Sequence, residues 1–578
     1  MKCAFNDFNM VSDKRKTTQY IMPYRKSNQM TLGYNIYPVL SLAEELISID
    51  MNQLAKRLSI QKTVIIDGYT GVFFGSFRER LNQELLLLGI DAHWICIDTA
   101  LREEEEINRL IAPFMGEDDS IFGRRATIDL KDYFDDEKLI SLRPEINASI
   151  NIIYGTGAQF AGWNGLFLYI DLPKNELQFR ARARSVKNLG ACQSYDIKDM
   201  YKRYYFVDWV VLNKHKKEVL EKIDIFIDGQ QDEVFPWIEA SELKKGLQTL
   251  SLNFFRVRPW FEPGVWGGTW IKNHIQGINA DAQNYAWSFE LITPENGIIF
   301  ESSGYLLEVS FDFLMLGEGK SILGKDYETY GYEFPLRFDF LDTFDGDNLS
   351  IQCHPTKEYC MKNFGENITQ EETYYILDKK NKACVYLGFQ ENIDPPEFEQ
   401  ALRNSANEVK ELNITGFVQK HKIHKHDLFL IPPGTIHGSG TDTLVLEIST
   451  TPYIFTFKLY DWVRPDLNGR PRPLNIDHGI KNLFFDRKGK KVREELISRP
   501  ILLKQGDNWM LYELPTHKKH SYRVKRYHFL NEIKVETYEK FHVLSLVEGD
   551  SITVTSERGL QNTFNYAETF VVSAAAKS

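Results

Sequence analysis

The chain has few cysteines, and none of them is arranged as a close pair. Its six cysteines lie at positions 3, 96, 192, 353, 360 and 384, and no Cys-x-x-Cys motif is present. Scattered thiols of this kind are typical of a protein that is kept reduced. We therefore expect a cytoplasmic protein without a disulfide framework.

Long apolar runs and an excess of positive charge are also missing. No stretch approaches the roughly 18 apolar residues of a membrane span, and residues 1–7 do not open the apolar core of a signal peptide. The formal net charge is -11, whereas binding to nucleic-acid phosphates requires clustered Lys and Arg. We expect neither a membrane nor a nucleic acid as partner, and the sequence does not indicate the oligomeric state.

At 578 residues the chain is too long for one hydrophobic core, which predicts a multidomain protein. Strands alternate with helical segments up to about residue 245, which favours an α/β domain with a mostly parallel sheet. Beyond that point, short strands broken by Gly, Pro and Asn turns are typical of β-rich jelly-roll barrels, with one inserted helix at 395–409. The predicted parts are a polar and helical segment 1–60, an α/β domain 61–245, a barrel with the helical insertion 246–495, and a second barrel 496–578.

A strand that enters a glycine turn opens the α/β domain. Residues 63–71 read Thr-Val-Ile-Ile-Asp-Gly-Tyr-Thr-Gly and precede a helix-like segment. Such a turn can present backbone N–H groups to a phosphate. The run resembles the phosphate loop of uridine-kinase-like P-loop proteins, but Phe73 and Phe74 stand where the family has Gly and the essential Lys. We interpret the domain as a degenerate, P-loop-kinase-like α/β domain.

Three arginines further along the α/β domain allow two interpretations. Arg180, Arg182 and Arg184 alternate along the chain. They could grip phosphates in the manner of a kinase lid, or they could lie on a solvated surface. We favour the exposed surface because Arg is mostly exposed in folded proteins.

Three separate runs in the β-rich part carry residues that can bind a metal ion. Gln352 and His354 lie two residues apart on a predicted strand, so their side chains project from one face. Glu372 opens another predicted strand, and His437 follows a Pro-Pro-Gly turn. Amide, imidazole and carboxylate groups offer mixed N and O ligands, for which zinc is the first candidate. The alternative is that these residues are ordinary members of the core.

Four motifs in this part resemble the class I mannose-6-phosphate isomerases, which are cupin-type phosphomannose isomerases. They are residues 349–355, the strand that Glu372 opens, the turn 432–437 and the run 468–472. The resemblance covers about residues 250–578 and implies a double cupin, or jelly-roll, architecture whose second barrel binds no metal. It also implies one catalytic Zn²⁺ per chain, held by Gln352, His354, Glu372 and His437.

The resemblance further implies residues for the reaction, the interconversion of mannose 6-phosphate and fructose 6-phosphate through an enediolate. Lys458 falls on the position of a proposed catalytic Arg of the family, Arg472 matches the second Arg of its Gly-Arg-Pro-Arg motif, and Glu447 matches an acidic site residue. Each has a structural alternative. Lys458 could lie on a strand surface, Arg472 could be exposed in its loop, and Glu447 could bond only a neighbouring backbone group.

Two positions depart from the family pattern. Related members carry Lys where this sequence has Asp339 and Gln370. We therefore keep three functions open, all with a small sugar phosphate as partner. The first is a metal-dependent aldose–ketose isomerase, the second is a cupin that binds or senses a sugar phosphate without catalysis, and the third is a bifunctional kinase–isomerase.

Overall fold

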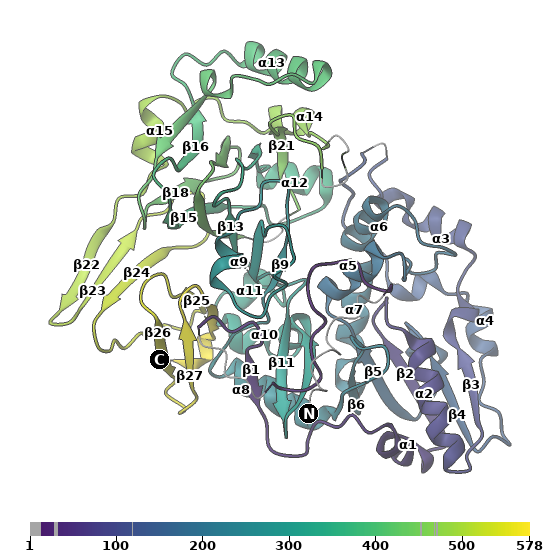
Figure 1. Cartoon of the computed structure of the whole chain (residues 1–578). Helices are drawn as coiled ribbons and strands as arrows, with labels where there is room; N and C mark the ends of the chain where they lie inside the picture. The colour runs from purple at the N-terminus through teal and green to yellow at the C-terminus, as the bar shows by residue number, and fades with distance from the viewer. Residues whose placement is uncertain are drawn as a thin grey trace. The chain divides into compact units, whose positions relative to one another are not determined.

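The computed structural model describes residues 13–27, 33–117, 119–450, 454–466, 469 and 472–577 (Figure 1). The chain forms two compact units. Unit 1 holds Tyr37–Leu252 and Pro294–Gly319 with the described residues before 28, and unit 2 holds Asn253–Thr293 and Lys320–Ser578 with residues 33–36. The predicted boundaries at 60, 245 and 495 are simpler than this division, because Pro294–Gly319 returns to unit 1 after the chain has already entered unit 2.

A six-stranded sheet forms the centre of unit 1. Its strands follow the order β3-β4-β2-β5-β6-β7, in which the first five are parallel and β7 is antiparallel. The inner strands are almost fully buried runs of Ile, Leu, Phe and Tyr, as expected for a parallel sheet. This confirms the predicted parallel α/β sheet. The strands are β2 Thr63–Gly68, β3 Ala92–Cys96, β4 Ile150–Tyr154, β5 Leu166–Asp171, β6 Ile225–Asp228 and β7 Trp237–Glu239.

Helices connect these strands, and a small second sheet completes unit 1. The first helix begins where Asp50 accepts hydrogen bonds from the backbone N–H groups of Asn52 and Gln53. The small sheet consists of β1 Val39–Ser41, β11 Gly297–Ser302 and β12 Tyr305–Ser310. The main helices are α1 Met51–Ser59, α2 Phe74–Leu87, α3 Glu104–Ile111, α4 Asp136–Ser141, α5 Lys174–Arg182, α6 Ile197–Arg203, α7 Trp209–Val219, α8 Ala240–Ser251 and α10 Phe311–Leu323.

The turn between β2 and α2 is filled by Arg180. This side chain is 1% exposed and donates to the carbonyl of Gly71 at 2.8 Å and to that of Gly229 at 2.9 Å. Its guanidinium also lies over the ring of Phe73, 4.1 Å from the centroid. The expectation of an exposed residue is therefore wrong for Arg180. Its guanidinium lies at the turn where a phosphate loop would offer N–H groups to a ligand.

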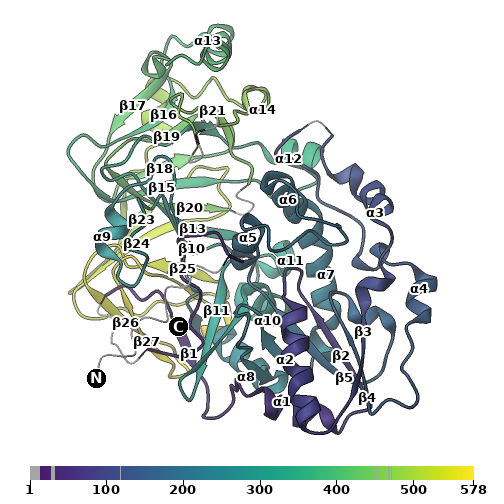
Figure 2. The same ribbon diagram turned by 45° about the vertical axis from the view of Figure 1, so that its right-hand side comes forward.

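Unit 2 is built around two antiparallel sheets (Figure 2). One has the order β18-β15-β20-β13-β10-β9 and the other β17-β16-β19-β14-β21. Buried side chains of both sheets, including Tyr374, Val385 and Phe429, form one core cluster, as in a jelly roll. The strands are β9 Trp260–Glu262, β10 Trp287–Leu291, β13 Leu336–Asp342, β14 Ile351–Cys353, β15 Glu372–Lys379, β16 Cys384–Phe389, β17 Val418–Lys422, β18 Leu428–Ile431, β19 His437–Ser439, β20 Thr443–Thr450 and β21 Phe457–Tyr460.

The predicted helical insertion is present as α13, Pro395–Glu408. Asp394 caps it by accepting from the Glu397 backbone N–H, and two prolines occupy its first positions. Shorter helices also occur in unit 2. They are α9 Trp270–His274, α11 Tyr327–Tyr330, α12 Lys357–Phe364, α14 Ile476–Ile480 and α15 Lys490–Glu495.

The C-terminal part of unit 2 is the region predicted as a second barrel, and Phe254, Phe564 and Phe570 form a core cluster there. Its strands form three small sheets in the described residues, and one of these takes β8 Phe254–Phe255 from the beginning of the unit. The sheets are β22 Ile501–Gly506 with β23 Trp509–Leu514 and β24 Val524–Phe529, then β25 His542–Ser545 with β28 Thr569–Val572 and β8, and finally β26 Ser551–Thr555 with β27 Gln561–Asn565. Among the helices that the structure describes, none is long and apolar enough to cross a membrane.

Candidate metal centre

Two imidazoles and a carboxylate converge inside the jelly roll. Glu372 opens β15, His437 opens β19, and His354 directly follows β14. The Oε2 atom of Glu372 lies 2.8 Å from His354 Nε2 and 3.0 Å from His437 Nε2, and all three side chains are buried. Their ligand atoms lie within 4.8 Å of one another, so the group could hold a metal ion.

Gln352, the fourth predicted ligand, lies beside this group. It is the cross-strand partner of His437, and its Nε2 lies 3.3 Å from His437 Nε2. Its Oε1 accepts a hydrogen bond of 2.9 Å from Ser350 Oγ. A half-turn of the terminal amide would direct the oxygen toward His437 instead. The structure thus brings together the four residues that the resemblance implied.

The hydrogen bonds of the imidazoles fit a metal centre. His354 Nδ1 lies 3.1 Å from the carbonyl of Phe455, and His437 Nδ1 lies 3.0 Å from that of Thr435. An Nδ1 that donates to a carbonyl leaves a lone pair on Nε2, and here both lone pairs face one carboxylate oxygen. The other oxygen of Glu372 is buried without a hydrogen-bond partner in the described chain. A divalent cation would satisfy all of these atoms at once.

Electrostatics favour a neutral His354 and an ionised Glu372. Burial lowers the pKa of His354, and the nearby carboxylate of Glu372 only partly opposes this effect. Burial alone would raise the pKa of Glu372, but His437 and His354 hold it well below its ordinary value. Neutral imidazoles and an ionised carboxylate are the forms that bind zinc.

The turn before His437 is fixed by Arg487. Its Nη1 donates to the carbonyls of Pro432 at 2.9 Å and Pro433 at 2.7 Å. Gly434 has a φ of +80°, a conformation that favours glycine, and a Cβ there would clash with the ring of Phe484. The position of His437 is therefore set by the turn itself.

A second polar cluster lies in unit 2, on the interior face of the sheet with the order β18-β15-β20-β13-β10-β9. Arg337 and Asp339 project from β13 with Arg337 Nε 3.2 Å from Asp339 Oδ1, and Arg337 Nη2 contacts Glu447 Oε1 on β20. Glu447 also accepts from Gln370 Nε2 at 3.2 Å and from Ser449 Oγ at 3.1 Å. The partners of Glu447 are thus side chains rather than a neighbouring backbone group. The Lys that related sequences carry at position 339 is absent here. Arg337, two residues earlier and on the same face of β13, supplies a cation instead.

Carboxylates outnumber cations in this interior. Glu372, Glu447 and Asp339 are all buried, and the guanidinium of Arg337 contacts Asp339 and Glu447. Burial raises the pKa of Asp339 to about 6 despite the opposing effect of Arg337. Burial also raises the pKa of Glu447 well above its ordinary value. A divalent cation would offset the negative charge of those carboxyl groups that are ionised.

Lys458 lies next to the candidate ligands. On β21 it is the cross-strand partner of Gln352, which in turn is paired with His437, so the three residues form one row across the sheet. Burial and then the charge of Arg472 lower the pKa of Lys458 to about 8. Its ammonium can therefore lose a proton near neutral pH.

Arg472 is engaged by a carboxylate of the chain. It contacts Asp461, which also accepts a hydrogen bond of 2.6 Å from Arg464 Nη2. The interpretation as a freely exposed loop residue is therefore wrong, since only 13% of the Arg472 side chain is exposed. Asn468, Arg470 and Pro471, which belong to the same motif, lie outside the described residues.

Sequence analysis did not identify two further groups near the centre. The Tyr374 hydroxyl is buried without a hydrogen-bond partner in the described residues, and Tyr374 is the cross-strand partner of Glu447. His520 lies in the loop between β23 and β24, stacked on Tyr522 with 5.3 Å between ring centroids. The His-Lys-Lys-His run at 517–520 was the available signal for the second group.

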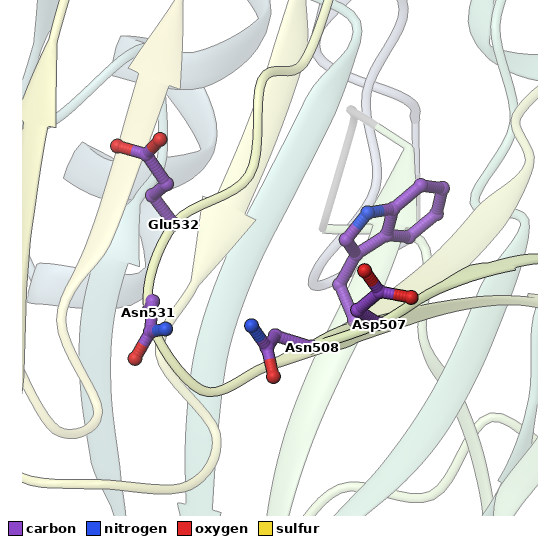
Figure 3. A pocket seen from close by; sticks show the side chains of 5 residues that line it. Asp507, Asn508, Asn531 and Glu532 are labelled. Atoms are coloured by element: carbon purple, nitrogen blue, oxygen red, sulfur yellow. The ribbon is translucent and has the colours of Figure 1, made fainter.

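A surface hollow elsewhere in unit 2 contains none of the predicted site residues. It has a volume of about 480 Å³ and lies at the end of the β22–β24 sheet where β22 turns into β23 (Figure 3). The carboxylates and amides around it come from the turn between β22 and β23 and from the segment that follows β24, and Trp509 contributes an indole. The residues that line it are Asp507, Asn508, Trp509, Asn531 and Glu532.

Comparison with known proteins gives matches to two parts of the chain, and the match to the first part does not test the predicted P-loop-kinase-like domain. Residues 50–252 match a domain of unknown function, DUF8485. The "Probable mannose-6-phosphate isomerase GmuF" of Bacillus subtilis is 26% identical over 266 residues, which are 44% of this chain and 78% of that protein. The mannose-6-phosphate isomerase ManA of the same organism is 26% identical over 224 residues, which are 39% of this chain and 66% of that protein.

A solved structure gives a match of similar extent. The mannose 6-phosphate isomerase from Bacillus subtilis aligns with a TM-score of 0.46 and 19% identity, over 56% of this chain and 95% of that chain. By sequence, 39–44% of this chain is similar to these two proteins named mannose-6-phosphate isomerases, while residues 50–252 match a domain to which no function is assigned.

Proposed function

We propose that the protein is a zinc-dependent aldose–ketose isomerase of a hexose phosphate, most simply mannose 6-phosphate and fructose 6-phosphate. The observation that carries the proposal is the meeting of two imidazole Nε2 atoms at one oxygen of Glu372, with both Nδ1 atoms oriented by backbone carbonyls. Sequence similarity to mannose-6-phosphate isomerases supports the choice of reaction.

Gln352, His354, Glu372 and His437 would hold the zinc ion. When bound there, the ion would stabilise the negative charge that develops on the sugar oxygens as the C–H proton leaves. The remaining tasks are proton transfers, which the chain's own side chains must perform.

Lys458 is the candidate base. Its pKa of about 8 gives a useful fraction of free amine near neutral pH, and its place beside Gln352 brings it to the edge of the candidate centre. Arg472 acts on it indirectly, because its positive charge helps to lower that pKa while Asp461 holds it in place. We therefore assign Arg472 as a positioning residue.

Glu447 is the candidate for moving the second proton between the two sugar oxygens. Its raised pKa keeps a proton available on a carboxyl group inside the barrel. Arg337, Gln370 and Ser449 hold this carboxyl group in place.

The direct test uses the full chain loaded with zinc and incubated with mannose 6-phosphate in D₂O. We expect fructose 6-phosphate to appear in NMR spectra, with solvent deuterium at the carbon that exchanges its proton. Elemental analysis of the same sample should give about one zinc per chain. A sample with that zinc content and no conversion of any hexose phosphate would refute the isomerase.

Asp339 and Gln370 favour a second candidate, a cupin that binds a sugar phosphate without converting it. These residues replace family lysines, and both are engaged within the interior cluster, Asp339 by Arg337 and Gln370 by Glu447. Saturable binding of mannose 6-phosphate in calorimetry, without any conversion, would favour this function.

A kinase activity of unit 1 is a weaker candidate because Arg180 fills the turn after β2. We expect calorimetry to show no binding of ATP with magnesium. A dissociation constant in the micromolar range would reinstate the bifunctional enzyme.

A further inference from the structure

Two arginines of the barrel, Arg337 and Arg472, are already engaged by carboxylates of the chain. Arg337 contacts Asp339 and Glu447, and Arg472 contacts Asp461. A phosphomonoester carries about two negative charges near neutral pH. Its recognition requires cations that are not already neutralised.

The loop between β23 and β24 supplies such cations. It contains Lys518 and Lys519, both exposed, between His517 and His520. The loop is a compact turn, because the His520 backbone N–H donates to the His517 carbonyl at 2.8 Å and the Lys519 N–H donates to His517 Nδ1 at 3.2 Å. The two lysines are therefore displayed together.

Hydrogen bonds from Ser521 and Tyr522 anchor this loop to the strands that carry the candidate metal centre. Ser521 Oγ donates to Glu371 Oε2 at 2.8 Å, and Glu371 immediately precedes Glu372. Tyr522 OH donates to the Ile448 carbonyl on β20 at 2.8 Å. The loop is thus held against the end of β15 at which Glu372 lies.

The loop also lies against the turn that leads to His437. Lys519 Nζ lies 4.5 Å from the ring centroid of Phe484, whose backbone N–H donates to the Gly434 carbonyl at 2.9 Å. His520 lies close enough to the backbone of Ile431 and to Arg487 for both to affect its pKa. The loop therefore contacts the segment that carries Glu372 and packs against the turn that leads to His437.

Positive charge dominates around this loop. Burial, together with the charges of Arg487, Lys519 and Lys518, lowers the pKa of His517 to about 4. Both ring nitrogens of His520 are shielded from solvent and lack a side-chain partner in the described chain. Neutral imidazoles beside two lysines offer N–H donors together with net positive charge, which suits a phosphate.

We propose that the His517–His520 loop is the phosphate subsite for a phosphorylated sugar whose other end lies at the candidate metal centre. Lys518 and Lys519 would contact the phosphate oxygens, and the loop's anchors would hold them beside Glu372 and His437. This inference rests on the function proposed above for its substrate class, but the binding of phosphate to the loop can be measured without turnover.

The test compares Lys518→Ala/Lys519→Ala with a matched control, Lys504→Ala/Lys525→Ala. The control removes two exposed lysines of the same three-stranded sheet that lie outside the loop. Affinities for inorganic phosphate, mannose 6-phosphate and mannose are measured on zinc-loaded full chains by calorimetry, and zinc content is checked for each protein.

We expect the loop variant to bind mannose 6-phosphate and inorganic phosphate roughly ten- to thirty-fold more weakly, because charge-assisted contacts are lost. Its affinity for mannose should be unchanged, and the control should behave as wild type. Lys518→Arg/Lys519→Arg should retain most of the affinity. Where the protein isomerises its substrate, the loop variant should raise KM and leave kcat nearly unchanged.

Equal phosphate affinity in the loop variant and the wild type would overturn the subsite even if the wild type isomerises mannose 6-phosphate. The opposite pattern, weaker phosphate binding by the loop variant without turnover by the wild type, would refute the isomerase and keep the subsite. Equal losses in the loop variant and the control would also overturn it, because the effect would then reflect overall charge.

Discussion

Two buried clusters of charged side chains, one in each unit, are balanced differently. In unit 1, Lys216 lies 3.0 Å from Asp171, and Lys174 contacts Asp312. Each of these cations meets a carboxylate. In unit 2, the interior of the jelly roll holds a surplus of carboxylates.

The difference separates a structural charge network from a candidate site. The paired charges of unit 1 are compensated within the fold, and the pKa of Asp312, which burial would raise, is held at about 2 by Lys174 and Lys216. In unit 2, the pKa of Asp339 instead rises to about 6. Uncompensated buried charge is costly, and a ligand of opposite sign can relieve that cost. Four predictions would break or sharpen this contrast.

The largest effect is expected for Lys216→Met in unit 1. This change would leave Asp171 buried without its principal cation, which should lower the free energy of unfolding by about 3–5 kcal/mol. Urea unfolding followed by tryptophan fluorescence would measure it. Lys244→Met, which removes an exposed cation paired with Glu221, should change stability little. Equal stability of the Lys216 variant and the wild type would remove the contrast between the units.

Glu372→Gln should abolish most zinc binding and activity. Loss of a partner that only orients a metal ligand costs about 10–100-fold, so loss of a ligand should cost more than about 100-fold in activity. Elemental analysis and an isomerisation assay would show both losses together. Glu397→Gln on α13 is a control that should keep full zinc content. Retention of zinc by the Glu372 variant would contradict the metal centre.

Asp339→Asn should stabilise the metal-free protein at neutral pH. A buried acid whose pKa is raised in the folded state loses stability as pH rises from its unfolded value near 4 to its folded value of about 6. The variant should lack this decline and gain about 1–3 kcal/mol in free energy of unfolding above pH 6. Urea titrations of chelator-treated protein at pH 4 and pH 7 would test it, with exposed Asp507→Asn as control. A variant less stable than wild type at pH 7 would show that Asp339 is well compensated.

The smallest effect concerns the pH dependence of turnover. If the free amine of Lys458 is the base, kcat should rise about tenfold between pH 7 and pH 9, because its pKa is about 8. Lys458→Arg should lose this rise, since a guanidinium keeps its proton throughout the range. A wild-type profile that is flat between these pH values would assign the base to another group.

The sequence predicted the parallel sheet of unit 1 and the strands around the candidate ligands. Local patterns suffice there, since buried runs such as residues 64–66 and the alternation of Gln352 and His354 fix strand and face. The insertion helix was equally clear from its prolines and apolar spacing.

The remainder depended on contacts between distant segments. Arg337 was not singled out because nothing local shows that it faces Glu447, more than a hundred residues away. The buried position of Arg180 depends on carbonyls of three other loop residues. The pairing of the C-terminal strands in three small sheets could not be predicted, because strand periodicity does not determine which strands pair.

Arg487 has a consequence for how the protein would exchange its ion. By donating hydrogen bonds to the carbonyls of Pro432 and Pro433, it orients the segment that ends at His437 without help from a metal ion. A ligand set arranged in advance need not refold when the ion departs. Stripping with a chelator should therefore be reversible, and zinc added back should restore the centre without a denaturation step.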